Sequence, residues 1–365
     1  MKKIITIYFI LFIVVQISCI EWNLTHCITS TTTLYDELSK LESDLNYKPE
    51  LTVDLYQQDN NLIDTEFSYD IDLSYKSKNN NELELTSKLY RGWLRYSTSQ
   101  TEFRFGLQKI NFGSALILRS LQWFDSINPN DPTKTTEGVK ALLGKYYFIN
   151  NANIWLWGIW GDANETSIDK FFYEEDNLEF GGRFQYPFQY CEAGFSAHHR
   201  PIDFLIFDTE TKYGLDLRWD MTIGLWFESS LYVYKNSELS EYLRLFTLGA
   251  DYTFEIGNGI YCLFEHQYYT DLQEDIWEPT DKSGAISLYL SYPLGMFDSL
   301  SSIMTYNWQF ELYNYYLSYN RNFDYVSIYL NSFWDQNQDQ NQSGHSYRSK
   351  SYDDKLIQIM LETKF

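Results

Sequence analysis

Side chains that alternate between apolar and polar recur along most of this chain. The clearest run is residues 67–75, where every odd position is apolar or aromatic and every even position is Ser or Asp. A period of two places the apolar side chains on one face of a β-strand and the polar ones on the other. Similar runs occupy residues 178–186, 213–219, 246–254, 286–292 and 313–319. The sequence therefore predicts a sheet with one face in an apolar phase and the other in water.

The composition indicates that the apolar phase is a membrane. Phe, Tyr and Trp make up 19% of the chain, with 32 Tyr, although the mean hydropathy is only −0.39. Amphipathic rings form the girdles of membrane β-barrels, whose strands are half polar. After the N-terminal segment, no stretch approaches the 18 or more apolar residues of a transmembrane helix. We expect an all-β fold, a transmembrane antiparallel up-and-down β-barrel of about 16 strands, within a range of 14–18, with short turns along one rim.

Both ends of the chain fit export to such a membrane. Lys2 and Lys3 precede an apolar run and small residues, so residues 1–19 are predicted to be a signal peptide, cut after Ser18 or Cys19. Its removal leaves a net charge of −24, from −22 for the whole chain, which argues against a nucleic-acid partner. The last nine residues alternate again and end on an aromatic residue.

A helical pattern precedes the predicted barrel. Leu34, Leu38, Leu41 and Leu45 are spaced by three or four residues, which predicts a short helix over 30–46. We therefore divide the mature chain into an N-terminal extension, 20–48, that contains this helix, and a transmembrane β-barrel, 49–365. The helix would act either as a spacer or as a plug.

These features resemble Gram-negative outer-membrane barrels of the porin-like kind. The resemblance lies in the strand pattern and in the apolar terminal residues Ile357, Ile359, Leu361 and Phe365, which are similar to the signal that such proteins present to the barrel-assembly machinery. It implies location in the outer membrane of a Gram-negative-type bacterium, contact with lipid and lipopolysaccharide, and a possible homo-oligomer. Thr363 departs from the apolar or aromatic residue that is usual at its position.

A local reversal of charge lies between residues 86 and 120, where six bases accompany a single acid. Charge on the lipid face is costly, so we expect these bases to form a basic wall in the lumen. They are Lys88, Arg91, Arg95, Arg104, Lys109 and Arg119. A β-bulge is predicted between Leu89 and Trp93, where the alternation slips.

The longest irregular stretch, residues 112–138, follows this wall. It is too apolar at its start to lie wholly in water, and it contains Asp125, Asp131 and Glu137. One interpretation is a constriction loop folded into the barrel, with these acids facing the basic wall. The other is a cap on one rim, with the wall bases balanced by lumenal acids.

The sequence contains no Gly-x-Ser-x-Gly, His-Glu-x-x-His or phosphate-loop motif. The adjacent His198 and His199 would point to opposite faces of a strand, so no metal site is expected. We expect a channel without cofactors for the passive diffusion of small hydrophilic solutes. The alternatives are a plugged structural or adhesin barrel and a lumenal hydrolase, such as a lipase, that uses His266 near Glu265.

Overall fold

The computed structural model describes residues 21–35, 41–78, 80–131, 133, 136–160, 178–204, 207–236, 239–270, 282–335 and 356–365. The predicted signal peptide lies outside these residues. Within the described part of the chain, no helix is long and apolar enough to cross a membrane.

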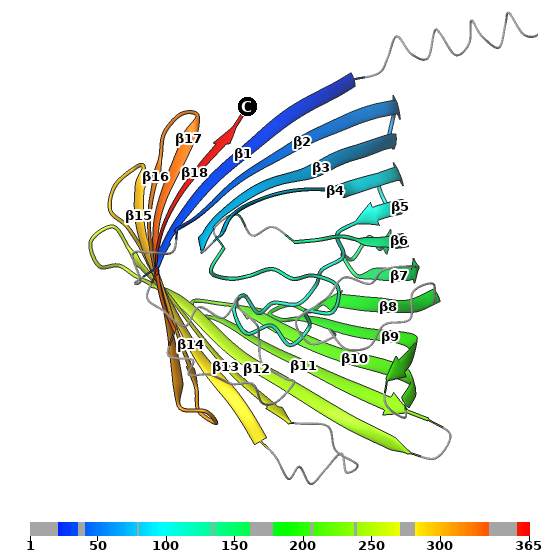
Figure 1. Cartoon of the computed structure of the whole chain (residues 1–365). Helices are drawn as coiled ribbons and strands as arrows, with labels where there is room; N and C mark the ends of the chain where they lie inside the picture. The colour runs from blue at the N-terminus through cyan, green and yellow to red at the C-terminus, as the bar shows by residue number, and fades with distance from the viewer. Residues whose placement is uncertain are drawn as a thin grey trace, which may run out of the picture.

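Eighteen antiparallel strands form one closed sheet (Figure 1). Each strand pairs with its neighbours in the sequence, and β1 pairs with β18 to complete the cylinder. The strands are β1 (Glu21–Tyr35), β2 (Leu41–Gln58), β3 (Asn61–Lys78), β4 (Asn80–Ser97), β5 (Thr101–Gln108), β6 (Val139–Tyr147), β7 (Asn153–Trp160), β8 (Leu178–Pro187), β9 (Glu192–Phe204), β10 (Phe207–Asp220), β11 (Gly224–Lys235), β12 (Ser240–Phe254), β13 (Ile260–Thr270), β14 (Lys282–Pro293), β15 (Asp298–Asn307), β16 (Leu312–Asn322), β17 (Val326–Asp335) and β18 (Leu356–Lys364). The predicted up-and-down barrel is confirmed, but with 18 strands rather than about 16.

The predicted helix over 30–46 is wrong, because β1 and β2 occupy its described residues, 30–35 and 41–46, and belong to the wall; Leu38 lies outside the described residues. In the β1–β2 hairpin, Leu34 lies directly opposite Leu41, and Leu45 lies opposite Ser30. Leu34 and Leu45 are exposed on the outer face of the barrel. A spacing of three or four residues across a hairpin thus imitated the apolar stripe of a helix. Residues 20–48 are therefore not a plug, since their described part starts the barrel.

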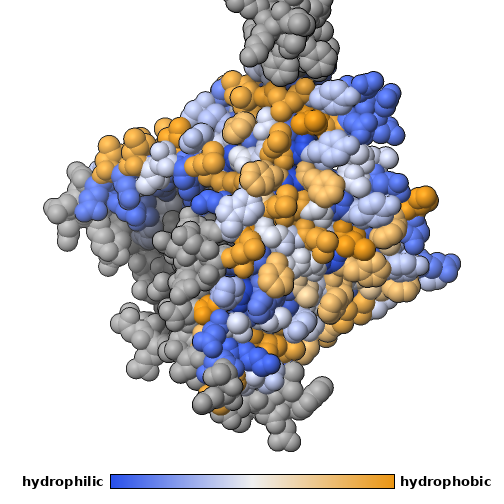
Figure 2. Space-filling model, turned by 90° about the vertical axis from the view of Figure 1, so that its right-hand side faces the viewer, coloured by the Kyte–Doolittle hydropathy of each residue, from blue (hydrophilic) through white to orange (hydrophobic). Residues whose placement is uncertain are grey.

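The outer face of the barrel is apolar. The terminal Ile357, Ile359, Leu361 and Phe365 are all exposed there, and Figure 2 shows one face of the molecule on which apolar and weakly polar side chains cover much of the surface. The backbones of His26 and Phe365 exchange hydrogen bonds of 2.8 and 3.1 Å at the β1–β18 seam. The chain terminus is thus part of the joint that closes the cylinder.

Turn length separates the two rims. The eight connections from an even-numbered strand to the next odd-numbered one contain two to five residues and lie together at one end, which we call the short-turn rim. These turns are 59–60, 98–100, 148–152, 188–191, 221–223, 255–259, 294–297 and 323–325. The opposite rim carries the long connection between β5 and β6, residues 109–138.

The predicted β-bulge is present on β4. Ser68 pairs with Arg91 while the next residue, Tyr69, pairs with Leu89, so Tyr90 is the extra residue. Before the bulge the even positions of β4 face the lumen, and after it the odd ones do. The bulge therefore turns both Lys88 and Arg91 inward, because it reverses the phase between them.

Candidate functional site

The described residues of the segment 109–138 lie inside the cylinder (teal in Figure 1, between β5 and β6). Its apolar side chains pack on the inward face of β6–β12, which makes this half of the lumen a dry core. The loop members of this core are Ile110, Phe112, Leu121, Trp123 and Phe124. Asp131, at the far end of the segment, is close enough to Tyr316 of β16 to interact with it electrostatically. The described residues of the segment therefore extend from β5 into the interior of the barrel, and its role as a constriction stays a prediction.

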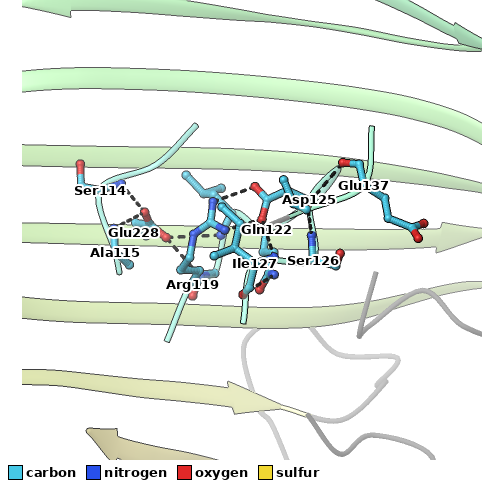
Figure 3. A network of polar contacts seen from close by, with 12 residues as sticks. Ser114, Ala115, Arg119, Gln122, Asp125, Ser126, Ile127, Glu137 and Glu228 are labelled. Atoms are coloured by element: carbon cyan, nitrogen blue, oxygen red, sulfur yellow. Dashed lines mark hydrogen bonds and ion pairs between the residues drawn. The ribbon is translucent and has the colours of Figure 1, made fainter. Parts of the chain in front are cut away.

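Glu228 of β11 anchors the first half of the segment (Figure 3). Its carboxylate has no exposed surface and accepts four backbone N–H groups of the segment. One oxygen accepts from Ser114 at 2.5 Å and Ala115 at 2.7 Å, and the other from Ser120 at 3.1 Å and Leu121 at 3.3 Å. Such hydrogen bonds to a charged acceptor are stronger than neutral ones.

Glu265 of β13 holds the neighbouring turn in the same way. It accepts the backbone N–H groups of Leu116, Ile117 and Leu118 at 2.6–3.0 Å and the indole N–H of Trp226 at 3.2 Å. Two fully buried carboxylates on the wall thus bind seven consecutive or nearly consecutive amides of the loop. Their charge is compensated by backbone dipoles, which is how a buried carboxylate is accommodated without a cation.

Hydroxyl and indole groups complete the attachment. Thr247 of β12 donates to the carbonyl oxygen of Leu118 at 2.6 Å and lies 2.8 Å from the hydroxyl of Ser120. The indole of Trp123 donates to Ser230 of β11 at 3.0 Å. These contacts fix the segment against the wall along β11–β13.

Arg119 and Asp125 do not face each other across the lumen. The two side chains form a buried, bidentate ion pair within the segment, and one of its two N–O distances is 2.9 Å (Figure 3). Arg119 is therefore a loop residue and not part of a basic wall, and Asp125 does not oppose that wall. The pair stiffens the loop from inside.

Two of the predicted wall bases pair with acids of the wall itself. Arg95 makes a bidentate contact of 2.6 and 2.9 Å with Asp64 of β3, and Arg104 lies 3.1 Å from Glu102 on its own strand. Both guanidinium groups lie over the ring of Trp93. They face the lumen as predicted, but their charges are largely neutralised.

The remaining three bases lie at the two ends of the inserted segment. Lys88 forms a half-exposed ion pair with Glu137, and Arg91 donates to the carbonyl oxygen of Thr136 at 2.6 Å. Lys109 stands at the start of the segment, where burial lowers the pKa of its ammonium group. Glu137 is thus a predicted loop acid that pairs with a predicted base on β4.

The open side of the lumen is acidic. From register, the inward positions of β2–β4 whose side chains the structure describes carry ten acids and five bases. The acids are Glu42, Asp44, Glu50, Asp54, Asp64, Glu66, Asp70, Asp72, Glu82 and Glu84, and the bases are Lys48, Lys76, Lys88, Arg91 and Arg95. Many of these side chains are partly exposed, whereas inward side chains of β6–β12 are buried under the loop. The water-accessible passage therefore runs along β2–β4.

The residues considered for a metal site or a hydrolase do not assemble. His198 is buried on the inner face, with Nε2 3.0 Å from Glu179 and Nδ1 accepting from Trp157, while His199 is on the outer face beside Thr211. In the described part of the chain, no group of three or more His, Cys, Asp or Glu side chains could hold a metal ion. Glu265 points inward to the loop, so the adjacent His266 points outward and cannot work with it.

Sequence reasoning missed Glu228 and Glu265. A signal was present, since each is an acid at an inward position of an otherwise apolar strand, in Trp226-Phe227-Glu228 and Leu263-Phe264-Glu265. A carboxylate in such a place requires donors from elsewhere. The sequence does not say which segment supplies them, because the partners are backbone amides more than a hundred residues away.

No protein-family model matches this sequence, and no curated protein does. Solved structures match it over nearly their whole length. Pseudomonas aeruginosa OccK8 (OprE) has a TM-score of 0.60 at 9% identity, covering 94% of this chain and 98% of its own. OccK5 (OpdH) of the same organism gives 0.59 at 10%, covering 95% and 98%, and Acinetobacter baumannii OccAB1 gives 0.59 at 9%, covering 95% and 96%. The chain therefore has the porin-like fold of the Occ/Opd outer-membrane barrels.

Proposed function

We propose that this protein is an outer-membrane channel for the passive diffusion of small hydrophilic solutes. The observation that carries the proposal is the division of the lumen. One half is filled by the inserted segment, and the other is lined by polar side chains that water still reaches. A barrel of this size is too wide for side chains alone to fill.

The proposal places the protein in the outer membrane of a Gram-negative-type bacterium, with lipid and lipopolysaccharide around it. Residues 1–19 would direct export, and the exposed Ile357, Ile359, Leu361 and Phe365 would be read by the barrel-assembly machinery. The fold of the Occ/Opd barrels supports this location. Homo-oligomerisation is left as an expectation of the resemblance.

The charge of the passage favours cations. Among the described residues of the loop, the bases are Lys109 and Arg119 and the acids are Asp125, Asp131 and Glu137, so the loop does not offset the excess of acids on β2–β4. Charged walls select permeant ions by their field in a narrow, poorly screened passage. We therefore expect small cations and cationic solutes to pass more readily than anions of the same size.

Single-channel recording in planar bilayers tests the function. The intact protein should give steady conductance, and deletion of residues 116–136 should raise it because the obstructing segment is removed. Silence in both forms would contradict the channel and support a plugged structural barrel. Turnover of detergent-dispersed lipid by the intact protein would instead support the hydrolase alternative.

A further inference from the structure

The short turns differ sharply in character around the rim. Six consecutive turns, from β6–β7 to β16–β17, carry exposed apolar side chains at or beside their tips. Ile149 is 94% exposed and Met296 92%, the highest values among the large apolar residues that the structure describes. The other two turns are polar, with Asp59-Asn60 between β2 and β3 and Thr98-Ser99-Gln100 between β4 and β5. An apolar surface of this extent requires a partner.

We propose that these six turns form an apolar collar that inserts into the phospholipid interface of the inner leaflet, while the two polar turns remain in water. The collar consists of Phe148, Ile149, Phe188, Tyr190, Met221, Ile223, Ile256, Leu294, Met296, Phe297, Phe323 and Tyr325. The inference rests on the proposed outer-membrane location. It assigns a lipid-binding role to the turns themselves and not only to the outward faces of the strands.

Aromatic pairs locate the membrane boundary next to the collar. On β6 and β8, Tyr146 packs edge-on against Phe148 and Tyr186 against Phe188, with ring centroids 4.9 and 4.8 Å apart. Tyr252 and Phe254 make the same contact, at 4.9 Å, at the end of β12. Outward tyrosines of this kind mark the membrane–water interface of a barrel.

The turn tips lie within the thickness of that interface. Two residues of a strand tilted by about 40° rise only about 5 Å along the barrel axis. The headgroup layer on each side of the hydrocarbon core is roughly 5–7 Å thick. Phe188 is two residues beyond Tyr186 and Ile149 is three beyond Tyr146. These side chains therefore rise at most roughly 5–8 Å above the tyrosine level and reach the outer part of the interface, where apolar side chains are favoured over exposure to water.

The register explains why the β2–β3 turn is polar. β1 is joined to β18 only as far as His26, so Glu21–Thr25 continue past Phe365. Glu21 pairs with Asp54, and β2 extends four residues further, Leu55–Gln58. Elsewhere on this rim, one strand overhangs the next by at most three residues. The β2–β3 hairpin consequently projects out of the interface, and its tip is Asp59-Asn60.

Site-specific lipid quenching tests the proposal. Cys19, Cys27, Cys191 and Cys262 are replaced by Ser, and single thiols are introduced as Ile149→Cys or Met296→Cys for the collar and Asn60→Cys or Ser99→Cys as controls. Each thiol carries a small environment-sensitive fluorophore. The protein is then reconstituted in phosphatidylethanolamine vesicles with or without lipid brominated near the headgroup end of its acyl chains. Quenching does not depend on the orientation of the barrel in the vesicle.

The collar positions should show blue-shifted emission and several-fold stronger quenching than the controls. Equal quenching at all four positions, with water-like emission, would overturn the proposal and leave the collar as a surface for a protein partner. Conductance of the same labelled variants is measured in parallel. Quenching at the collar without conductance would refute the channel but not the collar, so the two failures are distinguishable.

Discussion

The buried carboxylates of β11 and β13 should determine whether the lumen is obstructed. Glu228→Gln keeps one acceptor oxygen and replaces the other with an NH₂ group that faces two backbone donors. Two hydrogen bonds to a charged group are lost, at roughly 1.5–3 kcal/mol each, so docking of the segment weakens by about 3–6 kcal/mol. Adding Glu265→Gln, which removes a similar pair, brings the loss to about 6–12 kcal/mol.

Apolar contacts alone would not keep the segment in place. The five large apolar side chains of the segment contribute roughly 1.5–3 kcal/mol each on burial. Ordering the backbone costs about 1–2 kcal/mol per residue over a segment of more than twenty residues, which offsets this gain. A change of about 5.5 kcal/mol converts a 99:1 equilibrium to 1:99, so the double variant should release the segment.

Single-channel conductance is the assay, with protease cleavage within 112–138 as a second readout. The single variant should show added open-channel noise, and the double variant should show higher conductance and rapid cleavage. Glu137→Gln is the matched control, because its half-exposed pair with Lys88 contributes only about 0–1 kcal/mol. Heat-modifiable migration in detergent gels verifies that the barrel is intact. Wild-type conductance and protease resistance in the double variant would refute the anchoring role.

Three further outcomes are expected. In a KCl gradient the reversal potential of the wild-type channel should indicate a preference for cations. The double variant Asp70→Asn, Asp72→Asn should reduce this preference, because it removes two negative charges from the passage. A wild-type reversal potential that indicates a preference for anions would contradict the acidic passage. Gly106→Ala should destabilise the barrel by about 1–3 kcal/mol, since Gly106 has φ +120° and a Cβ would collide with the carbonyl oxygen of Gly92. Gly158→Ala is the control, because its Cβ would make only an ordinary contact of 3.9 Å with the carbonyl oxygen of Glu179; equal melting temperatures of the two variants would contradict this. Burial lowers the pKa of the Lys109 ammonium group below its usual 10.5 when the segment is docked. Below that lowered pKa, the charged ammonium group opposes docking. Deprotonation removes this cost, so the protease resistance of 112–138 should increase as the pH rises toward 10.5. Lys109→Met should remove this pH dependence. A protease resistance that falls as the pH rises would contradict the prediction.

Sequence alone determined the class of fold and the membrane face. A strand of a membrane barrel has one apolar face toward lipid and one polar face toward the lumen. The alternation of apolar and polar residues in runs such as 67–75 and 357–365 shows this directly. It also identified the bulge near Tyr90, because a slip in a strict period of two is visible locally. The strand number was less accessible, since β1 and the start of β2 imitate a helix when read in one dimension.

Only the tertiary structure decided what the lumen does. The charges of Arg95, Arg104 and Arg119 looked available in the sequence, but each has a carboxylate partner: Asp64 on the adjacent strand for Arg95, Glu102 on the same strand for Arg104, and Asp125 within the folded loop for Arg119. The role of Glu228 and Glu265 depends on backbone amides of a segment that enters from the opposite rim. Local periodicity reports which face a side chain is on, whereas its partners across the lumen depend on long-range closure, which no local pattern encodes.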